Sequence, residues 1–306
     1  MPWWIYLIVG IILFVAVALR VGAYFILKKL YKPSKRDYDF ILDYEIKEKG
    51  FQKRWLDIPF TAYRRESRYG YEVFGRYYEC PTPSNKIMLS IHGHNSCGLS
   101  QMKYLELFLG LGYNVFIPDH KRSGFSGGDI ITFGATEKYD VIDWIDLLEK
   151  EYPGKRFAIF GESMGGATSM MVADLDKRIE YLMEYCGYAD FEGLLSKYIK
   201  NKTVRKVLEP TFESISRLFF KIEFNDFNAG KSLARVKKPT LIIHSEADKT
   251  VDFYNCEKLR AIKPDAKVHV FKDSMHARSM VKYPEEFTKV ITEFVREAEE
   301  KVNMEH

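Results

Sequence analysis

Gly161-Glu162-Ser163-Met164-Gly165 is the stretch of sequence that decides the fold of this chain. It directly follows a strand-like run, and a helix-like run continues from it. A G-x-S-x-G sequence in this position predicts a tight strand-to-helix turn, which holds the serine in a strained backbone conformation with its hydroxyl above the edge of a sheet. Gly161 and Gly165 are needed because a Cβ atom at either position would collide across the turn. Ser163 is therefore the candidate nucleophile.

Strand-like and helix-like segments alternate along the rest of the chain. Apolar residues recur at helical spacing and predict helices over 101–111, 138–151 and 285–300. Short apolar runs bounded by turn residues predict strands over 71–78, 86–91, 114–117, 156–160, 179–185, 240–244 and 267–271. This alternation predicts an α/β fold, in which helices cover both faces of a mostly parallel sheet.

Size and charge narrow the class of protein. With 306 residues, 46% of them hydrophobic, the chain can bury a large core, and we expect one domain of roughly 250 residues with an appendage. The formal net charge is +4, but the first 36 residues hold six Lys and Arg and no acidic residue. The remainder therefore carries a charge of about −2, which argues against a nucleic-acid surface.

The cysteines and the metal-ligating residues predict no cofactor. Four cysteines are scattered along the chain without a C-x-x-C or other metal-ligand spacing, so we expect reduced thiols in or near the core. The sequence contains no cluster of metal ligands and no dinucleotide-binding fingerprint. We therefore expect a site that works without metal or cofactor.

The amino terminus predicts a transmembrane anchor over residues 1–30. Residues 3–19 are all apolar, glycine or tyrosine, and the apolar run resumes after Arg20. As a helix, this segment is long enough to cross a bilayer of about 30 Å. Residues 16–18 resemble a signal-peptide cleavage site, but no positive charge precedes the apolar run, and a core helix would keep a polar face. An uncleaved, single-pass anchor is therefore expected.

The distribution of basic residues predicts the orientation. Lys and Arg near the anchor lie on its carboxyl side, so the positive-inside rule predicts a cell-membrane protein whose globular domain is cytoplasmic. Residues 31–54 turn polar and are interpreted as a juxtamembrane linker or helix. The globular domain is expected over 55–300.

A serine hydroxyl is a poor nucleophile until a histidine takes its proton and a carboxylate orients that histidine. His276 is the candidate base, because it lies in the loop between the last predicted strand and the last helix, whereas His306 is terminal. Asp248 is the candidate acid, since it follows the carboxyl end of a strand, where catalytic groups of an open sheet collect. Asp252 and Glu246 are close alternatives.

An oxyanion needs two backbone N–H donors. Met164 follows the candidate nucleophile at the positive amino end of a helix and can supply one of them. The other is expected from the turn His92-Gly93-His94-Asn95 after a predicted strand. We choose His94, with Asn95 as the alternative, and expect His92 to make a structural hydrogen bond.

Together these residues resemble the α/β-hydrolase superfamily of serine hydrolases over about residues 55–300. The chain is similar to the bacterial, membrane-associated branch of BEM46-like and prolyl-oligopeptidase-related hydrolases. The order of Ser163, Asp248 and His276 along the chain matches the order of roles in that superfamily. The loop that usually reads D-x-R-G-x-G-x-S is a variant here, and we expect it to be structural. The motifs that carry the resemblance are His92-Gly93-His94-Asn95, residues 118–128, residues 161–166, residues 239–244, Asp248 and His276.

An insertion at about residues 188–237 resembles the small helical lid of the family. Its aromatic residues are expected mainly to pack the lid onto the sheet, but an aromatic lid close to a bilayer also favours an apolar acyl chain over a charged substrate. They include Phe191, Phe212, Phe219, Phe220 and Phe224.

These observations predict a membrane-anchored serine hydrolase that cleaves carboxylic esters with acyl or lipid-like groups. Its expected partners are a small-molecule ester or lipid substrate and the membrane, without nucleic acid. A peptidase, an amidase or an acyltransferase would use the same three side chains and stays an alternative. A non-enzymatic binding protein would be expected to have lost at least one of the candidate residues, and all are present.

Overall fold

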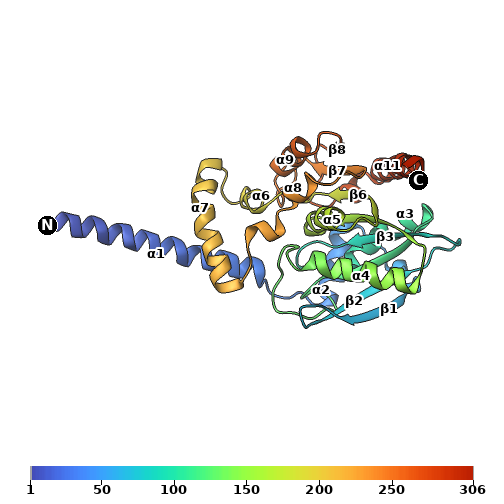
Figure 1. Cartoon of the computed structure of the whole chain (residues 1–306), viewed down its shortest axis with the longest axis horizontal. Coiled ribbons are helices and arrows are strands. Elements are labelled where there is room, and N and C mark those ends of the chain that lie inside the picture. The colour runs from blue at the N-terminus through green and yellow to red at the C-terminus, as the bar shows by residue number, and fades with distance from the viewer. Residues whose placement is uncertain (1, 306) are drawn as a thin grey trace.

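A mostly parallel, eight-stranded sheet forms the centre of the protein, whose computed structural model describes residues 2–305 (Figure 1). The strand order is β1-β2-β4-β3-β5-β6-β7-β8. β2 is antiparallel to both of its neighbours, and the other neighbouring strands are parallel. Met1 of the predicted anchor and His306 lie outside the described residues. The strands are β1 (Thr61–Glu66), β2 (Glu72–Tyr78), β3 (Lys86–Ile91), β4 (Asn114–Asp119), β5 (Arg156–Glu162), β6 (Ile179–Tyr185), β7 (Thr240–Ser245) and β8 (Lys267–Phe271).

Helices cover both faces of this sheet, as the alternation predicted. In β3, Ile87 and Leu89 lie in a hydrophobic cluster with α4 and α5, whereas Met88 points to the other face, into a cluster with α3 and α11. The central strands are thus buried on both sides, which confirms the predicted α/β architecture. The helices around the sheet are α3 (Leu105–Gly110), α4 (Glu137–Glu151), α5 (Met164–Leu175), α9 (Tyr254–Ile262), α10 (Ser279–Lys282) and α11 (Pro284–Glu305).

The segment between β6 and β7 folds into a small helical cap. Aromatic rings fill its interior: the ring centroids of Phe191 and Phe224 are 3.7 Å apart, and Phe227 is fully buried. Phe191, Phe212 and Phe224 therefore pack in the core cluster, as expected, whereas Phe219 and Phe220 pack against Tyr24 of the N-terminal helix. The elements of the cap are α6 (Phe191–Leu195), α7 (Lys202–Ile215), the π-helical turn η3 (Ser216–Phe220), η4 (Phe224–Phe227) and α8 (Ala229–Leu233).

Helix α1 (Trp3–Tyr31) extends away from the rest of the protein, and α7 lies against its carboxyl-terminal part (Figure 1). Among the described residues it is the one helix long and apolar enough to cross a membrane, with a mean hydropathy of 2.6 and no burial in its most apolar window. A core helix would be buried, so that alternative is wrong. Only Ala23, Leu27 and Tyr31, one turn apart on one face, are buried.

The polar segment after α1 is packed onto the globular body. Helix α2 (Tyr38–Lys49) begins where the Asp37 carboxylate accepts a hydrogen bond from the Phe40 N–H, at 2.7 Å, and ends at Gly50 in the left-handed conformation. Its residues Ile41, Glu45 and Lys49 are buried. Of the two interpretations of this segment, linker or helix, the structure shows a helix, and its buried residues belong to the core.

Two further elements differ from expectation. β1 was not predicted because it is an exposed edge strand. Its sequence, TAYRRE, lacks the alternation of apolar and polar residues that indicates a half-buried strand. The segment 101–111 does not form one helix: the 3-10 helix η2 (Gly98–Tyr104) precedes α3. The buried Asp119 carboxylate accepts a hydrogen bond from the Gly98 N–H at 2.6 Å, and this tertiary contact fixes the tighter turn.

Candidate active site

Ser163 lies at the turn between β5 and α5, in the strained conformation that its sequence context predicted. Its φ is 59° and its ψ −119°, and its N–H donates to the Tyr185 carbonyl at 2.7 Å. A Cβ atom on Gly161 would lie 2.2 Å from the Gly165 carbonyl oxygen, and one on Gly165 would lie 2.1 Å from the Ile91 carbonyl oxygen. Both glycines are therefore required for the turn that presents the serine hydroxyl.

The three side chains selected from sequence are joined by hydrogen bonds. His276 Nε2 is 2.9 Å from Ser163 Oγ, and His276 Nδ1 is 2.6 Å from Asp248 Oδ2. The other oxygen of Asp248 accepts from the backbone N–H groups of Thr250 and Val251, at 2.7 and 2.9 Å. This network assigns the imidazole proton to Nδ1 and leaves Nε2 free to accept the serine proton.

Asp248 remains a carboxylate in this setting. Burial would raise its pKa, but the hydrogen bond from His276 and the charges of nearby groups hold the pKa below its ordinary value. The alternative Asp252 instead pairs with Lys200, with 2.6 Å between Nζ and oxygen. The structure therefore brings Asp248 to His276 and gives Asp252 another partner.

Other histidines have structural partners. His92 Nε2 accepts a hydrogen bond from the His120 N–H at 2.9 Å, and its Nδ1 lies 2.8 Å from the Gly93 carbonyl oxygen. His244 Nε2 lies 3.0 Å from the Val251 carbonyl oxygen. Burial lowers the pKa of both imidazoles, so they stay neutral. The structural role expected for His92 is confirmed.

The turn after β3 lies beside the serine. A Cβ atom on Gly93 would be 3.2 Å from the Ser163 Cβ, so the turn approaches the nucleophile closely because Gly93 has no side chain. Among the described residues, the backbone N–H groups of His94 and Met164 have no hydrogen-bond acceptor. Met164 is the first residue of α5, where the helix leaves its N–H unpaired. Each of the two segments next to the serine thus carries one N–H group without an acceptor among the described residues.

A metal ion is the other chemistry to consider at this site. Cys186, Asp248 and His276 each place one possible ligand atom within 4.8 Å of the others. Burial raises the pKa of the Cys186 thiol, so it is protonated and a poor ligand, and the other two side chains already bind each other. The arrangement fits proton transfer better than metal coordination.

Comparison with known proteins adds the family. Residues 100–301, more than half of the chain, match the prolyl oligopeptidase family of peptidases. The chain belongs to this family. Among curated proteins, the uncharacterized protein YqkD of Bacillus subtilis is 28% identical over 241 residues, which is 77% of this chain and 79% of that protein. Human monoglyceride lipase is 30% identical over 107 residues, 34% of this chain and 35% of that protein.

Solved structures confirm the α/β-hydrolase fold. The esterase Pf2001 of Pyrococcus furiosus has a TM-score of 0.66 at 20% identity, over 81% of this chain and 95% of that chain. Est1E of Butyrivibrio proteoclasticus, solved with ferulic acid, has a TM-score of 0.60 at 14% identity, over 77% of this chain and 98% of that chain. The family match and this shared fold together confirm the superfamily resemblance drawn from the motifs.

Sequence reasoning missed one element of this family member's site, a buried lysine that contacts the histidine loop. Lys49 Nζ donates to the His276 carbonyl oxygen at 2.6 Å and to the Ala277 carbonyl oxygen at 3.0 Å. Ala277 has a φ of 53°, so the loop is bent at the residue after His276. Lys49 thus holds the backbone of the histidine loop from helix α2.

The same helix also reaches the residue before the serine. Lys103 lies 2.8 Å from the Glu162 carboxylate and 3.4 Å from that of Glu45 on α2, and all three side chains are buried. Tyr104 donates a further hydrogen bond to Glu162 at 2.5 Å. The sequence did not mark these residues, because Glu45 and Lys49 lie in a polar segment and charged side chains read as exposed.

Proposed function

We propose that this protein is a serine hydrolase that cleaves carboxylic esters through a catalytic triad of Ser163, His276 and Asp248. The observation that carries the proposal is the hydrogen-bonded series from serine to histidine to carboxylate. It is supported by one backbone N–H group on each of the two adjacent segments that has no acceptor within residues 2–305. The esterases among the structural neighbours and the lipase among the curated relatives support an ester as the substrate.

In the proposed reaction, Ser163 Oγ attacks the acyl carbon while its proton passes to His276 Nε2. Asp248 stabilises the imidazolium that forms, and the N–H groups of Met164 and His94 bind the oxyanion. The imidazolium then gives its proton to the leaving alcohol, and the acyl-enzyme remains. Water, deprotonated by His276, attacks this acyl group, and the serine is restored with release of the acid.

A lipid-like acyl ester fits the position of the site relative to α1. His94 Nε2 lies 2.9 Å from the carbonyl oxygen of Leu30, which is in the last turn of that helix. We propose that α1 is a single-pass anchor in the cell membrane, that the hydrolase domain of about residues 55–300 is cytoplasmic, and that the cap of about residues 188–237 shapes the acyl pocket. The site would then lie close to the bilayer, where lipid esters are available.

A peptidase is the second candidate, because the family whose profile the chain matches is one of peptidases. The same three residues hydrolyse amides, and transfer of the acyl group to an acceptor other than water would also use them. The substrate therefore has to be tested directly.

The test compares ester and peptide substrates on the full chain in detergent. A fragment that starts after α1 would lose Leu27 and Tyr31, which are buried in the core. p-Nitrophenyl esters from acetate to palmitate are assayed beside a proline p-nitroanilide, with Ser163→Ala as the inactive variant. Ser169→Ala, a buried serine on α5, is the matched control. Ester hydrolysis lost only in Ser163→Ala supports the proposal, and cleavage of the anilide alone favours the peptidase.

A further inference from the structure

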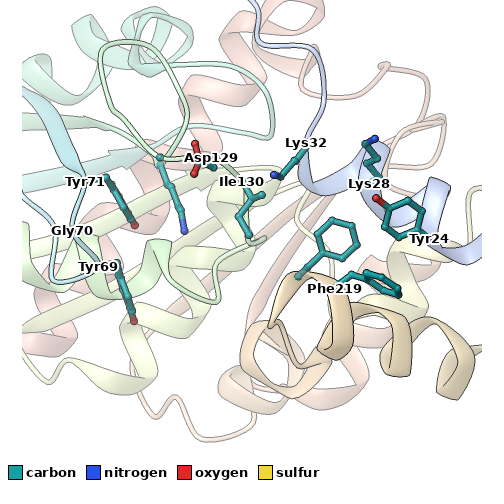
Figure 2. Close-up of a pocket in the computed structure, with 12 residues that line it drawn as sticks. Tyr24, Lys28, Lys32, Tyr69, Gly70, Tyr71, Asp129, Ile130 and Phe219 are labelled. Atoms are coloured by element: carbon teal, nitrogen blue, oxygen red, sulfur yellow. The ribbon is translucent and has the colours of Figure 1, made fainter.

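A cavity of about 640 Å³ lies where the carboxyl-terminal end of α1 meets the cap and the loop after β4. Figure 2 shows its two sides: Tyr69 and Tyr71 lie on one, Tyr24 and Phe219 lie on the other, and Ile130 is between them. Among the described residues, none of the proposed triad lines it. The cavity is therefore separate from the candidate active site.

Three lysines give this cavity a positive charge. Lys28 lies in the last turn of α1, Lys32 directly follows the end of that helix, and Lys121 approaches from the loop after β4. Within residues 2–305 no carboxylate lies within 4 Å of any of the three ammonium groups, and Asp129 is the one acidic residue in the lining. The site thus has an excess of two positive charges for an anion to neutralise.

The position of Lys121 depends on a glycine. A Cβ atom on Gly128, whose φ is 97°, would lie 2.7 Å from the Lys121 Cγ. The ammonium group of Lys121 lies 4.9 Å from the centre of the Tyr71 ring, which holds it against the cavity wall. The lysine is thus held at the cavity although it comes from a part of the chain remote from α1.

The opposite wall is apolar and partly exposed. Tyr24 of α1 packs against Phe219 and Phe220 of the cap, with ring centroids 5.1 and 5.9 Å apart. Phe219 and the neighbouring Leu218 are 56% and 61% exposed. Aromatic and apolar side chains at the end of a membrane span are suited to the boundary between headgroups and acyl chains. The cavity therefore combines a cationic part with an apolar part.

The walls are held together before any ligand binds. The Ile131 N–H donates to the Tyr31 carbonyl oxygen at 2.8 Å, and the Arg122 guanidinium donates to the Pro33 carbonyl oxygen at 2.9 Å. The Tyr31 and Ser216 hydroxyls are 2.9 Å apart and join α1 to the cap. A preformed cavity loses little conformational entropy when it binds a ligand.

We propose that this cavity binds the phosphate headgroup of an anionic membrane lipid, with the acyl chains along Phe219 and the exposed face of α1. The lysines neutralise the phosphate, and the apolar wall accepts the adjoining glycerol and first methylenes. The inference rests on the proposed membrane span of α1 but not on the proposed ester hydrolysis.

The test is isothermal titration calorimetry of the full chain in a non-ionic detergent, in the Ser163→Ala background so that no lipid is hydrolysed. The ligands are dihexanoyl phosphatidylglycerol, dihexanoyl phosphatidylcholine and inorganic phosphate. We expect one site for phosphatidylglycerol and at least tenfold weaker binding of the other two. Lys121→Gln should weaken the binding of phosphatidylglycerol about fivefold. Replacement of all three lysines by Gln should weaken it about 100-fold.

Lys29→Gln is the matched control, because Lys29 is an exposed residue of α1 outside the cavity lining. An effect of Lys29→Gln equal to that of Lys121→Gln would mean non-specific attraction and overturn the proposal. Equal binding of inorganic phosphate would mean a free-anion site, and no binding of phosphatidylglycerol would also overturn it. None of these three results bears on ester hydrolysis, which is measured separately on the protein with Ser163 intact.

Discussion

Lys49 Nζ and the carbonyl oxygen of His276 are 2.6 Å apart, so a lysine before the first strand of the sheet holds the loop of the proposed catalytic base. Such contacts matter because the base has to stay aligned with both the serine and the carboxylate during proton transfer. Helix α2 is therefore part of the structure that positions the site.

Replacement of Lys49 by Met should reduce kcat about tenfold or more, because the backbone around His276 loses both ammonium contacts. We expect KM to change little, since Lys49 touches backbone rather than the nucleophile. Loss of a buried cation beside Glu45 and Glu162 should also lower the free energy of unfolding by about 3 kcal/mol. Ester kinetics well below the Tm check the first effect, and Lys47→Met, an exposed site on α2, is the control. An unchanged kcat would contradict the positioning role.

Replacement of Asp248 by Asn should reduce kcat about 10⁴-fold, because an amide favours the wrong imidazole tautomer and does not stabilise the imidazolium. Asp252→Asn breaks only the ion pair with Lys200 and should keep most of the activity. Steady-state ester hydrolysis separates the two variants. Equal losses in both would show that Asp248 has no special role.

Glu184 gives a prediction about pH. It is fully buried, and its Oε1 atom has no hydrogen-bond partner within residues 2–305. Burial raises its pKa to about 8, which the hydrogen bond from the Gly187 N–H only partly offsets. The folded protein therefore keeps this proton up to about pH 8, whereas the unfolded chain loses it near the ordinary value of 4.5. Stability should fall as the pH rises through this interval and level off above it.

Replacement of Glu184 by Gln should remove this dependence, because the amide is neutral at every pH. The free energy of unfolding of Glu184→Gln, relative to that of the natural protein, should increase from pH 5 to pH 9 by an amount on the order of 4 kcal/mol. Thermal unfolding of both proteins across this range tests it. A difference in Tm that stays constant with pH would contradict the buried-proton account.

The positions of the candidate site residues could be predicted because each follows a strand. Ser163, Asp248 and His276 all come after strongly apolar runs, and the carboxyl ends of parallel strands meet at one edge of a sheet. The number of residues between these three side chains did not enter the prediction, because their positions at the ends of strands were sufficient. The glycine pattern around Ser163 added the geometry of the turn.

The contacts of α1 and α2 could not be predicted in the same way. The buried face of α1, at Ala23, Leu27 and Tyr31, is hidden in a helix that is apolar on all sides, so no periodicity marks it. The buried pair of Lys103 and Glu162 joins segments far apart in sequence, and isolated charges read as exposed. Such clusters are defined only by the tertiary fold.

The measurement that tests the central claim most directly is labelling of the full chain with a fluorophosphonate ester, followed by intact mass and peptide mapping. The probe phosphonylates a serine that is activated by its histidine and releases fluoride. We expect one adduct, on the peptide that contains Ser163, together with complete loss of ester hydrolysis. Inactivation with the adduct on another serine, or full activity with Ser163 labelled, would contradict the account.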